Sequence, residues 1–217
     1  MLSLTLPYDA GRPPKILCLG AHSDDIEIGC GGAILRLSQD YPGCSFYWVV
    51  FSASELRAAE ARRAAELFAG PAIPGGPRIK GFKDGFMPFE GAEVKAVFED
   101  LKQTVSPDLV FTHHRRDAHQ DHRLLAELTW NTFRNHFILE YEIPKYDGDL
   151  GQPNVFVPLQ AATSEKKIEH IMRAFKSQQG KRWFQPDVFR SFMRLRGMEC
   201  NATSGYAEAF YGHKLVF

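Results

Sequence analysis

The pattern of hydrophobic and polar positions predicts alternating strands and helices over the first two thirds of the chain. Short apolar runs bounded by prolines, glycines or polar turns are typical of buried strands. The predicted strands are 15–21, 45–51, 78–82 and 108–112. Apolar residues at helical spacing separate them, and the predicted helices are 26–39, 54–68, 92–105 and 119–133. Helices of this length allow right-handed crossovers, so we predict an α/β fold with a Rossmann-like parallel sheet flanked by helices.

The pattern changes in the last third of the chain. Strands are expected at 137–143 and 154–158, joined by a loop rich in Gly, Pro and Asp at 144–153. Further elements are a helix at 164–178 with Ser164 as its N-cap, a helix at 187–195 and a terminal strand at 209–217. Because no linker separates this part, we expect a single domain over 1–217, with the C-terminal strands and helices elaborating one core.

Composition narrows the classes of function. Among the 217 residues, 26 Lys and Arg balance 26 Asp and Glu, which argues against a nucleic-acid-binding surface. The sequence shows no signal-peptide pattern and no apolar stretch of membrane-spanning length. The four cysteines are too few and too scattered for a disulfide framework, and because none forms a CxxC pair, a Cys-based zinc knuckle is excluded too. We therefore expect a cytoplasmic protein without a membrane span.

Two segments at predicted strand ends concentrate imidazoles and carboxylates. His22-Ser23-Asp24-Asp25 and Glu27 follow the first strand, and residues 113–122 (HHRRDAHQDH) follow the strand at 108–112. In a parallel sheet, ligands bind outside the carboxyl ends of the strands, so we expect both segments to face one site.

Residue spacing in these segments suits a catalytic zinc with three N or O ligands and an open position. His22 and Asp25 are close enough to converge on one ion, and either His119 or His122 can supply the third ligand. The remaining histidine is then free beside the metal as an acid or as a stabiliser of the transition state. Asp121 is placed to orient an imidazole, and Asp24 is a candidate general base.

Structural roles are the alternative for each residue type. Asp24 or Asp25 can cap the helix that follows, and histidines after a strand are often surface residues. Gly29, Gly31 and Gly32 are not a GxGxxG motif, which leaves little support for dinucleotide binding. We expect these glycines to allow close approach to a neighbouring strand instead. Glu27 either anchors the first loop or faces solvent.

The two polar segments resemble the signatures of a known family. Residues 21–27 (AHSDDIE) are similar to the AHPDDxE motif of the PIG-L (LmbE-like) zinc-dependent N-deacetylases, and residues 117–122 (DAHQDH) resemble their DxHxDH motif. Further likeness lies at 57–60 (RAAE) with 64–65 (AA), at 81–85 (GFKDG) and at 206–210 (YAEAF), so it spans roughly 15–212. Ser23 stands where the family motif has a proline, which loosens the loop but leaves every chemical group in place.

The resemblance implies a role for each matching residue. Zinc ligands are implied at His22, Asp25 and His122, with Asp24 as the general base for metal-activated water. His119 is implied as general acid or oxyanion stabiliser, held by Asp121. Arg57 and Asp84 match positions near the sugar, so we expect them to contact substrate. The implied metal is Zn²⁺, with Fe²⁺ as an alternative because a His₂Asp set does not discriminate firmly between them.

The leading hypothesis is a hydrolase that removes an N-acetyl group from an N-acetylglucosamine-containing small molecule, glycoconjugate or nucleotide sugar. Two alternatives stay open: a zinc hydrolase of another amide or ester, and a non-catalytic nucleotide-binding module. Residues 70–90 and 144–153 are the expected specificity loops, and the apolar C-terminal strand is a candidate surface for a homo-oligomer. Outside the implied ligand set, we expect structural or surface roles for His113, His114, His136, His170 and His213.

Overall fold

One mixed sheet organises the fold. The computed structural model describes residues 2–6 and 11–216. Within them, seven strands are arranged in the order β3-β2-β1-β4-β5-β7-β6. The strands are β1 (Lys15–Gly20), β2 (Ser45–Val50), β3 (Arg78–Ile79), β4 (Leu109–His113), β5 (Phe137–Tyr141), β6 (Val155–Leu159) and β7 (Tyr206–Gly212).

The direction of the strands divides the sheet into two parts. Strands β1 to β5 all pair in parallel, whereas β7 pairs antiparallel with both β5 and β6. The predicted Rossmann-like parallel sheet is therefore confirmed for the first five strands. The C-terminal third continues the same sheet at the β5 edge, as an antiparallel extension.

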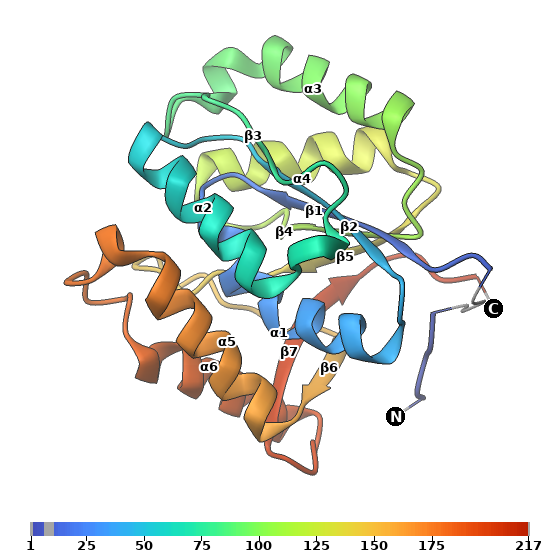
Figure 1. Ribbon diagram of the computed structural model, residues 1–217, viewed down its shortest axis with the longest axis vertical. Helices are drawn as coiled ribbons and strands as arrows, with labels where there is room; N and C mark the ends of the chain where they lie inside the picture. Colours follow the sequence, from blue (N-terminus) through green and yellow to red (C-terminus); the bar gives the residue numbers. More distant parts are fainter. Residues whose placement is uncertain (1, 7–10, 217) are drawn as a thin grey trace.

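Helices cover both faces of the sheet. The α-helices are α1 (Asp25–Asp40), α2 (Glu55–Phe68), α3 (Gly91–Thr104), α4 (Gln120–Thr132), α5 (Ala161–Ala174) and α6 (Pro186–Glu199). Three short 3₁₀-helices are found among the described residues, η1 (Gly70–Ala72), η2 (Met87–Glu90) and η3 (Lys176–Gln178). Helices α3 and α4 lie on one face, with α1, α5 and α6 on the other (Figure 1). None of the described helices is long and apolar enough to cross a membrane.

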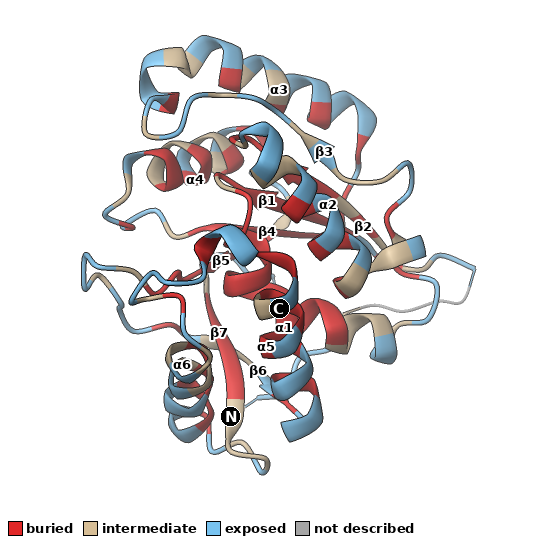
Figure 2. Cartoon of the chain, turned by 60° about the vertical axis from the view of Figure 1, so that its left-hand side comes forward, coloured by how far each residue is buried: buried red, intermediate tan, exposed pale blue. Residues whose placement is uncertain are grey.

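Apolar side chains fill the space on both sides of the sheet, and the buried faces of the helices point inward (Figure 2). Trp48, Phe111 and Phe210 pack with residues of α1, α2 and α5. On the opposite face, Phe51 and Phe98 stack with ring centroids 5.3 Å apart. Burial on two faces explains why the parallel strands are continuous apolar runs in the sequence.

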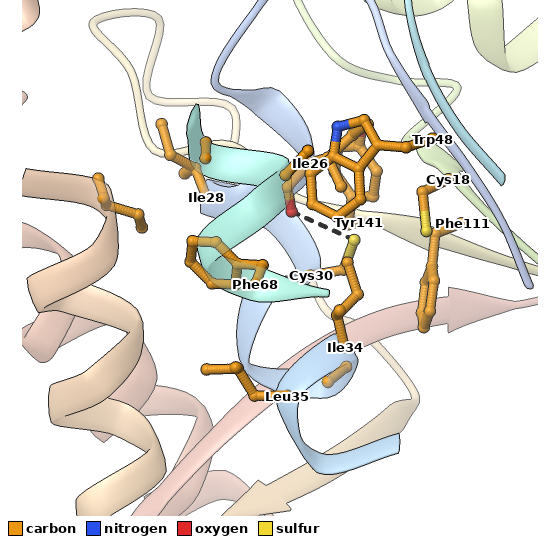
Figure 3. Packing of buried hydrophobic residues seen from close by; sticks show 14 of the residues in the cluster. Cys18, Ile26, Ile28, Cys30, Ile34, Leu35, Trp48, Phe68, Phe111 and Tyr141 are labelled. Carbon is orange, nitrogen blue, oxygen red and sulfur yellow. Dashed lines mark hydrogen bonds between the residues drawn. The ribbon is translucent and has the colours of Figure 1, made fainter. Parts of the chain in front are cut away.

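Helix α1 packs closely against Phe68 of α2 and Tyr141 of β5 (Figure 3), and its glycines permit this approach. A Cβ at Gly29 would overlap the ring of Tyr141 in β5, and one at Gly32 would lie 2.5 Å from Leu159 in β6. The prediction of close contact with strands is confirmed for these two positions. Gly31 faces α2 instead, where a Cβ would lie 2.6 Å from Phe68.

Two predicted boundaries in the C-terminal third are wrong. Helix α5 starts at Ala161, directly after β6, so its N-cap is Gln160 and Ser164 lies buried in the first turn with its hydroxyl donating to the Gln160 carbonyl. The final strand is shifted to Tyr206–Gly212, because its partners β5 and β6 end their pairing there. Residues 213–216 are not strand, and Phe217 lies outside the described residues.

Candidate active site

The two polar segments meet at the point where the strand order reverses. Strands β1 and β4 are adjacent and parallel, with Ile16 opposite Leu109 and Cys18 opposite Phe111. From β1 the order continues to β2 on one side, and from β4 to β5 on the other. The carboxyl ends of adjacent strands at such a reversal form a binding crevice in open α/β sheets. His22 and His122 are brought together there although 100 residues separate them.

Three donor atoms form a nearly equilateral triangle in this crevice. His22 Nδ1 lies 3.1 Å from His122 Nε2 and 3.4 Å from Asp25 Oδ2, and the latter two atoms are 3.5 Å apart. Ligands at ~2.0–2.1 Å from a tetrahedral zinc lie about 3.3–3.4 Å from one another. The predicted ligand atoms therefore fit one divalent ion without any rearrangement of the backbone.

Carboxylates behind the two histidines fix their orientation. His122 Nδ1 lies 3.0 Å from Asp117 Oδ2, and His22 Nε2 lies 3.2 Å from Asp121 Oδ2 and 3.1 Å from Asp84 Oδ1. A carboxylate on the far nitrogen of a metal-binding imidazole sets its tautomer and its direction. Each ring thus presents its other nitrogen to the common centre.

Two further histidines border the triangle. The ring centroid of His119 lies 4.8 Å from that of His22 and 4.7 Å from that of His122, which makes these three a second possible donor group. His113 is fully buried, and its Nε2 accepts the backbone N–H of Ala21 at 2.9 Å. The same Nε2 lies 3.2 Å from Asp25 Oδ2. Because its lone pair already accepts a backbone N–H, His113 stays outside the proposed ligand set.

Asp24 is held by an arginine rather than used as a helix cap. It occupies the N-cap position of α1, yet its side chain makes no capping hydrogen bond. Asp24 Oδ1 lies 2.7 Å from Arg57 Nη2, and Oδ2 is buried without a hydrogen-bond partner among the described residues. Burial raises the pKa of Asp24, although the Arg57 charge opposes this shift. Arg57 therefore points into the site and not to solvent.

Asp121 supports a different imidazole from the one we expected. Its carboxylate accepts backbone N–H groups from Gly85 at 2.7 Å and from Met87 at 3.2 Å, and it contacts His22. Its contact with His119 is through the backbone, since the Asp121 N–H donates to His119 Nδ1 at 3.3 Å. The first turn of α4 directs the Asp121 side chain toward the loop after β3, which explains the difference.

Electrostatics in the site favour a bound cation. Burial lowers the pKa of His22, but contacts with Asp25, Asp121 and Asp84 outweigh it and hold that pKa well above its usual value. For Asp25, burial raises the pKa, and the surrounding imidazoles more than reverse that shift. Several carboxylates surround the imidazoles of the site, and a divalent ion bound there would offset their negative charge.

Some functional features could not be assigned from the sequence. Glu27 is fully buried and neither of its oxygens is hydrogen-bonded to a described residue, so it is neither a loop anchor nor a solvent-facing residue, and burial raises its pKa strongly. Asp117 belongs to the second motif, but only the structure shows it behind His122. Ser23 is buried, and its hydroxyl makes no hydrogen bond within the described residues.

Several histidines lie outside the donor triangle, as expected. His114 and His213 both contact the buried carboxylate of Glu140, at 2.7 Å and 3.2 Å. His170 packs against Phe68 and His136 against Phe133. None of these four contacts His22, Asp25 or His122 in the described structure.

A mixed α/β sheet with a His₂Asp donor set at its topological switch point is typical of metal-dependent α/β enzymes. The chain belongs to the PIG-L family, whose model is described as GlcNAc-PI de-N-acetylase and matches residues 17–133. That match includes both motifs and ends before the C-terminal third. The protein is accordingly an enzyme of the metal-dependent N-deacetylase type.

Similar proteins extend this picture. A relative from Escherichia coli K12, the uncharacterized deacetylase YaiS, is 29% identical over 157 residues, which are 66% of this chain and 82% of the relative. The N,N'-diacetylchitobiose deacetylase of Pyrococcus horikoshii superposes with a TM-score of 0.69 at 21% identity, covering 94% of this chain and 85% of that one. GalB of Pseudomonas putida KT2440, a 4-carboxy-2-hydroxymuconate hydratase, superposes with a TM-score of 0.73 at 17% identity, covering 94% and 98%. The same fold therefore carries more than one reaction.

Proposed function

We propose that the protein hydrolyses the N-acetyl group of an N-acetylglucosamine-containing small molecule, glycoconjugate or nucleotide sugar, releasing acetate and a free amine. The observation that carries this proposal is the triangle of His22, Asp25 and His122 donor atoms, with the spare carboxylate of Asp24 next to it in the chain. The activity for which the family is named and the N,N'-diacetylchitobiose after which the Pyrococcus enzyme is named support an N-acetylated amino sugar.

His22, Asp25 and His122 would hold the metal, for which Zn²⁺ or Fe²⁺ suits an N₂O set. When bound, such an ion would lower the pKa of a water molecule and polarise the amide carbonyl. The chain itself contributes the fixed donors. Asp117 and Asp121 hold the two imidazoles in the required orientation.

Asp24 is the proposed general base. Its Oδ1 is fixed by Arg57, which leaves the buried Oδ2 free to accept a proton from water. A base held in one rotamer by an ion pair loses little entropy on reaching the transition state. After the C–N bond breaks, the same carboxylic acid is placed to return the proton to the leaving amine.

His119 is the proposed stabiliser of the developing oxyanion. Because its Nδ1 accepts the Asp121 N–H, the neutral ring carries its proton on Nε2 and can donate from that atom. Its ring lies beside those of His22 and His122, so this donor would be close to a carbonyl bound at the proposed metal site.

Arg57 and Asp84 are proposed to contact the sugar. The Asp84 side chain is 78% exposed and adjoins His22, so its carboxylate is accessible to sugar hydroxyls. Arg57 uses Nη1 and Nη2 in contacts with the protein, and its further N–H groups are available to substrate.

The test is release of acetate from a panel of N-acetylated amino sugars, with simple amides, simple esters and an unsaturated dicarboxylate as comparison substrates. We expect hydrolysis of at least one N-acetyl sugar by the zinc-loaded protein and loss of that activity after chelation. Turnover of esters alone would support the alternative hydrolase, and hydration of the alkene alone would support chemistry like that of GalB. Full metal loading without any turnover of a sugar would contradict the proposal.

A further inference from the structure

Arg57 is the residue through which α2 reaches the proposed general base. Its Nη2 lies 2.7 Å from Asp24 Oδ1, and its Nη1 donates to Glu60 Oε2 at 2.9 Å. Glu60 is one helical turn further along α2 and is 4% exposed. The guanidinium therefore lies between two carboxylates, one at the start of α1 and one in its own helix.

Glu60 is itself fixed by a residue from the C-terminal third. The backbone N–H of Ser177 in η3 donates to Glu60 Oε1 at 2.7 Å, and the Ser177 hydroxyl donates to Glu60 Oε2 at 2.6 Å. Arg57 Nη1 also donates to the Ser177 hydroxyl, at 3.3 Å. Phe175, next to η3, lies under the guanidinium with its ring centroid 5.3 Å away.

These contacts leave Arg57 little freedom. The side chains of Arg57, Glu60 and Asp24 are 18%, 5% and 7% exposed, so their charges interact in a partly desolvated setting. A long Arg side chain has many rotamers, and pairing at both ends selects one of them. Without Glu60, the same guanidinium would keep its attraction to Asp24 but lose its fixed position.

We infer that Glu60 and Ser177 are positioning residues, which act through Arg57 to fix the carboxylate of Asp24. The inference rests on the proposed function, because it assigns a purpose to the fixed position of the base. Ser177 lies outside residues 17–133, where the family model matches. The C-terminal third therefore supplies part of the apparatus of the site, and not only extra strands.

The kinetic test compares Glu60→Gln and Ser177→Ala with the wild-type zinc enzyme. A base displaced by a fraction of an ångström lowers kcat, so we expect Glu60→Gln to lose about tenfold or more in kcat and Ser177→Ala to lose about threefold. Zinc content should change by less than about twofold, and the loss in kcat should exceed any change in KM. Ser177→Thr keeps a hydroxyl at this exposed position, so this variant should retain the wild-type kcat.

A matched control and a double mutant separate positioning from simple support of the fold. Glu165→Gln on α5, at an exposed ion pair with Arg190 of α6, should leave kcat unchanged. In an Arg57→Ala background, Glu60→Gln should have no further effect on kcat. If Glu60→Gln lowers the thermal midpoint of unfolding but leaves kcat at the wild-type value, the inference is wrong. If Glu60→Gln does not fold, Ser177→Ala and Ser177→Thr decide the matter.

A stability measurement keeps this test independent of the substrate. Ser177 and Asp24 do not touch, so Ser177→Ala and Asp24→Asn should be additive in thermal unfolding unless Arg57 and Glu60 couple them. We expect the shift in Tm caused by Ser177→Ala to fall by about half in the Asp24→Asn background. If the Tm shifts of Ser177→Ala and Asp24→Asn are fully additive, the inference that Glu60 and Ser177 position Asp24 through Arg57 is wrong, even if no acetylated sugar is hydrolysed. Conversely, absence of hydrolysis together with clear coupling would reject only the proposed function.

Discussion

Single atoms in this site serve more than one purpose. Asp25 Oδ2 accepts the backbone N–H of His22 at 2.6 Å and also lies within 3.5 Å of His122 Nε2. The hydrogen bond closes the turn between β1 and α1, and that turn brings the His22 ring to the same centre as the carboxylate. At the residue scale, the backbone of this turn and the donor set are therefore one structure.

Loss of a ligand should be visible in the metal content. His122→Ala removes one of three donors, so we expect zinc to fall well below one equivalent, as measured by elemental analysis after dialysis. His119→Ala should keep about one equivalent and lower kcat mainly, because its ring is proposed to act on substrate. His136→Ala, which lies outside the site against Phe133, is the control. Full zinc retention in His122→Ala would remove His122 from the ligand set.

Asp24 should matter for the reaction and not for the metal. Asp24→Asn keeps the shape of the side chain but removes its ability to take a proton, so we expect kcat to fall about 10²-fold or more with unchanged zinc content. The measurement is acetate release at saturating substrate. Asp40→Asn, at the exposed far end of α1, should behave as wild type. An equal kcat in the Asp24 and Asp40 variants would exclude the proposed base.

At the scale of elements, α1 determines where the first motif lies. The helix is held from the opposite side by a buried ion pair between Lys167 of α5 and Glu208 of β7, with Nζ and Oε1 2.6 Å apart. Glu208 accepts the N–H groups of Gly32 and Ala33, and Lys167 donates to the carbonyl of Ile28. The glycine at position 32 admits the carboxylate, since a Cβ would lie 2.9 Å from Glu208 Oε1. Through this contact, the glycine-rich segment 29–32 of α1 packs against the segment 206–210 of β7.

A methyl group on the strand-facing side of α1 should destabilise the fold. Gly29→Ala places a Cβ against the Tyr141 ring, which cannot move freely because its hydroxyl donates to the Leu19 carbonyl at 2.5 Å. We expect a loss of about 1–3 kcal/mol in the free energy of unfolding from overpacking. Gly91→Ala is the matched control, since Gly91 begins α3 with φ −60° and a Cβ there would have no neighbour within 4 Å. Chemical denaturation measures both, and an unchanged stability for Gly29→Ala would contradict this packing.

At the scale of the whole molecule, a buried carboxylate joins parts that are distant in the sequence. Glu140 of β5 accepts from Trp130 Nε1 of α4 at 2.6 Å and from the Arg115 guanidinium at 3.0 Å. His114 and His213 lie against the same carboxylate from the ends of β4 and β7. The antiparallel extension is thereby fastened to the parallel part of the sheet.

This cluster predicts a pH dependence of stability. Burial raises the pKa of Glu140, but hydrogen bonds from His114, Trp130 and the Arg115 backbone outweigh it and lower the pKa to about 2. A carboxyl group with a pKa of ~4.3 in the unfolded chain then contributes stability above pH ~4.3, and this contribution is lost as the pH falls toward the folded-state pKa.

Glu140→Gln isolates this contribution. At pH 7 we expect the variant to be less stable by on the order of 2 kcal/mol, and the gap to the wild type should narrow as the pH is lowered from 5 to 3. Urea unfolding at several pH values measures it. For Glu165→Gln, at an exposed ion pair, the difference in stability from the wild type should not change comparably with pH. A constant gap between pH 7 and pH 3 would show that the Glu140 charge does not stabilise the fold.

Local sequence determined much of this protein. The apolar runs and helical periods predicted the parallel strands and most helix positions, because a strand buried on both faces needs an uninterrupted apolar segment. The two motifs likewise identified the residues that gather at the switch point, since polar side chains directly after such strands have one edge of the sheet in common. The predicted boundaries of α5 and β7 were wrong because the true boundaries depend on where the neighbouring strands end.

Tertiary structure alone decided the partnerships between side chains. Nothing local to Asp121 shows that its carboxylate faces His22, and nothing local to Arg57 shows that Ser177 and Asp24 lie beside it. Such contacts join helices and loops whose relative positions are set by packing on the sheet. The chemistry of a residue is a property of its own atoms, whereas its partner is selected by the whole arrangement of the chain around it.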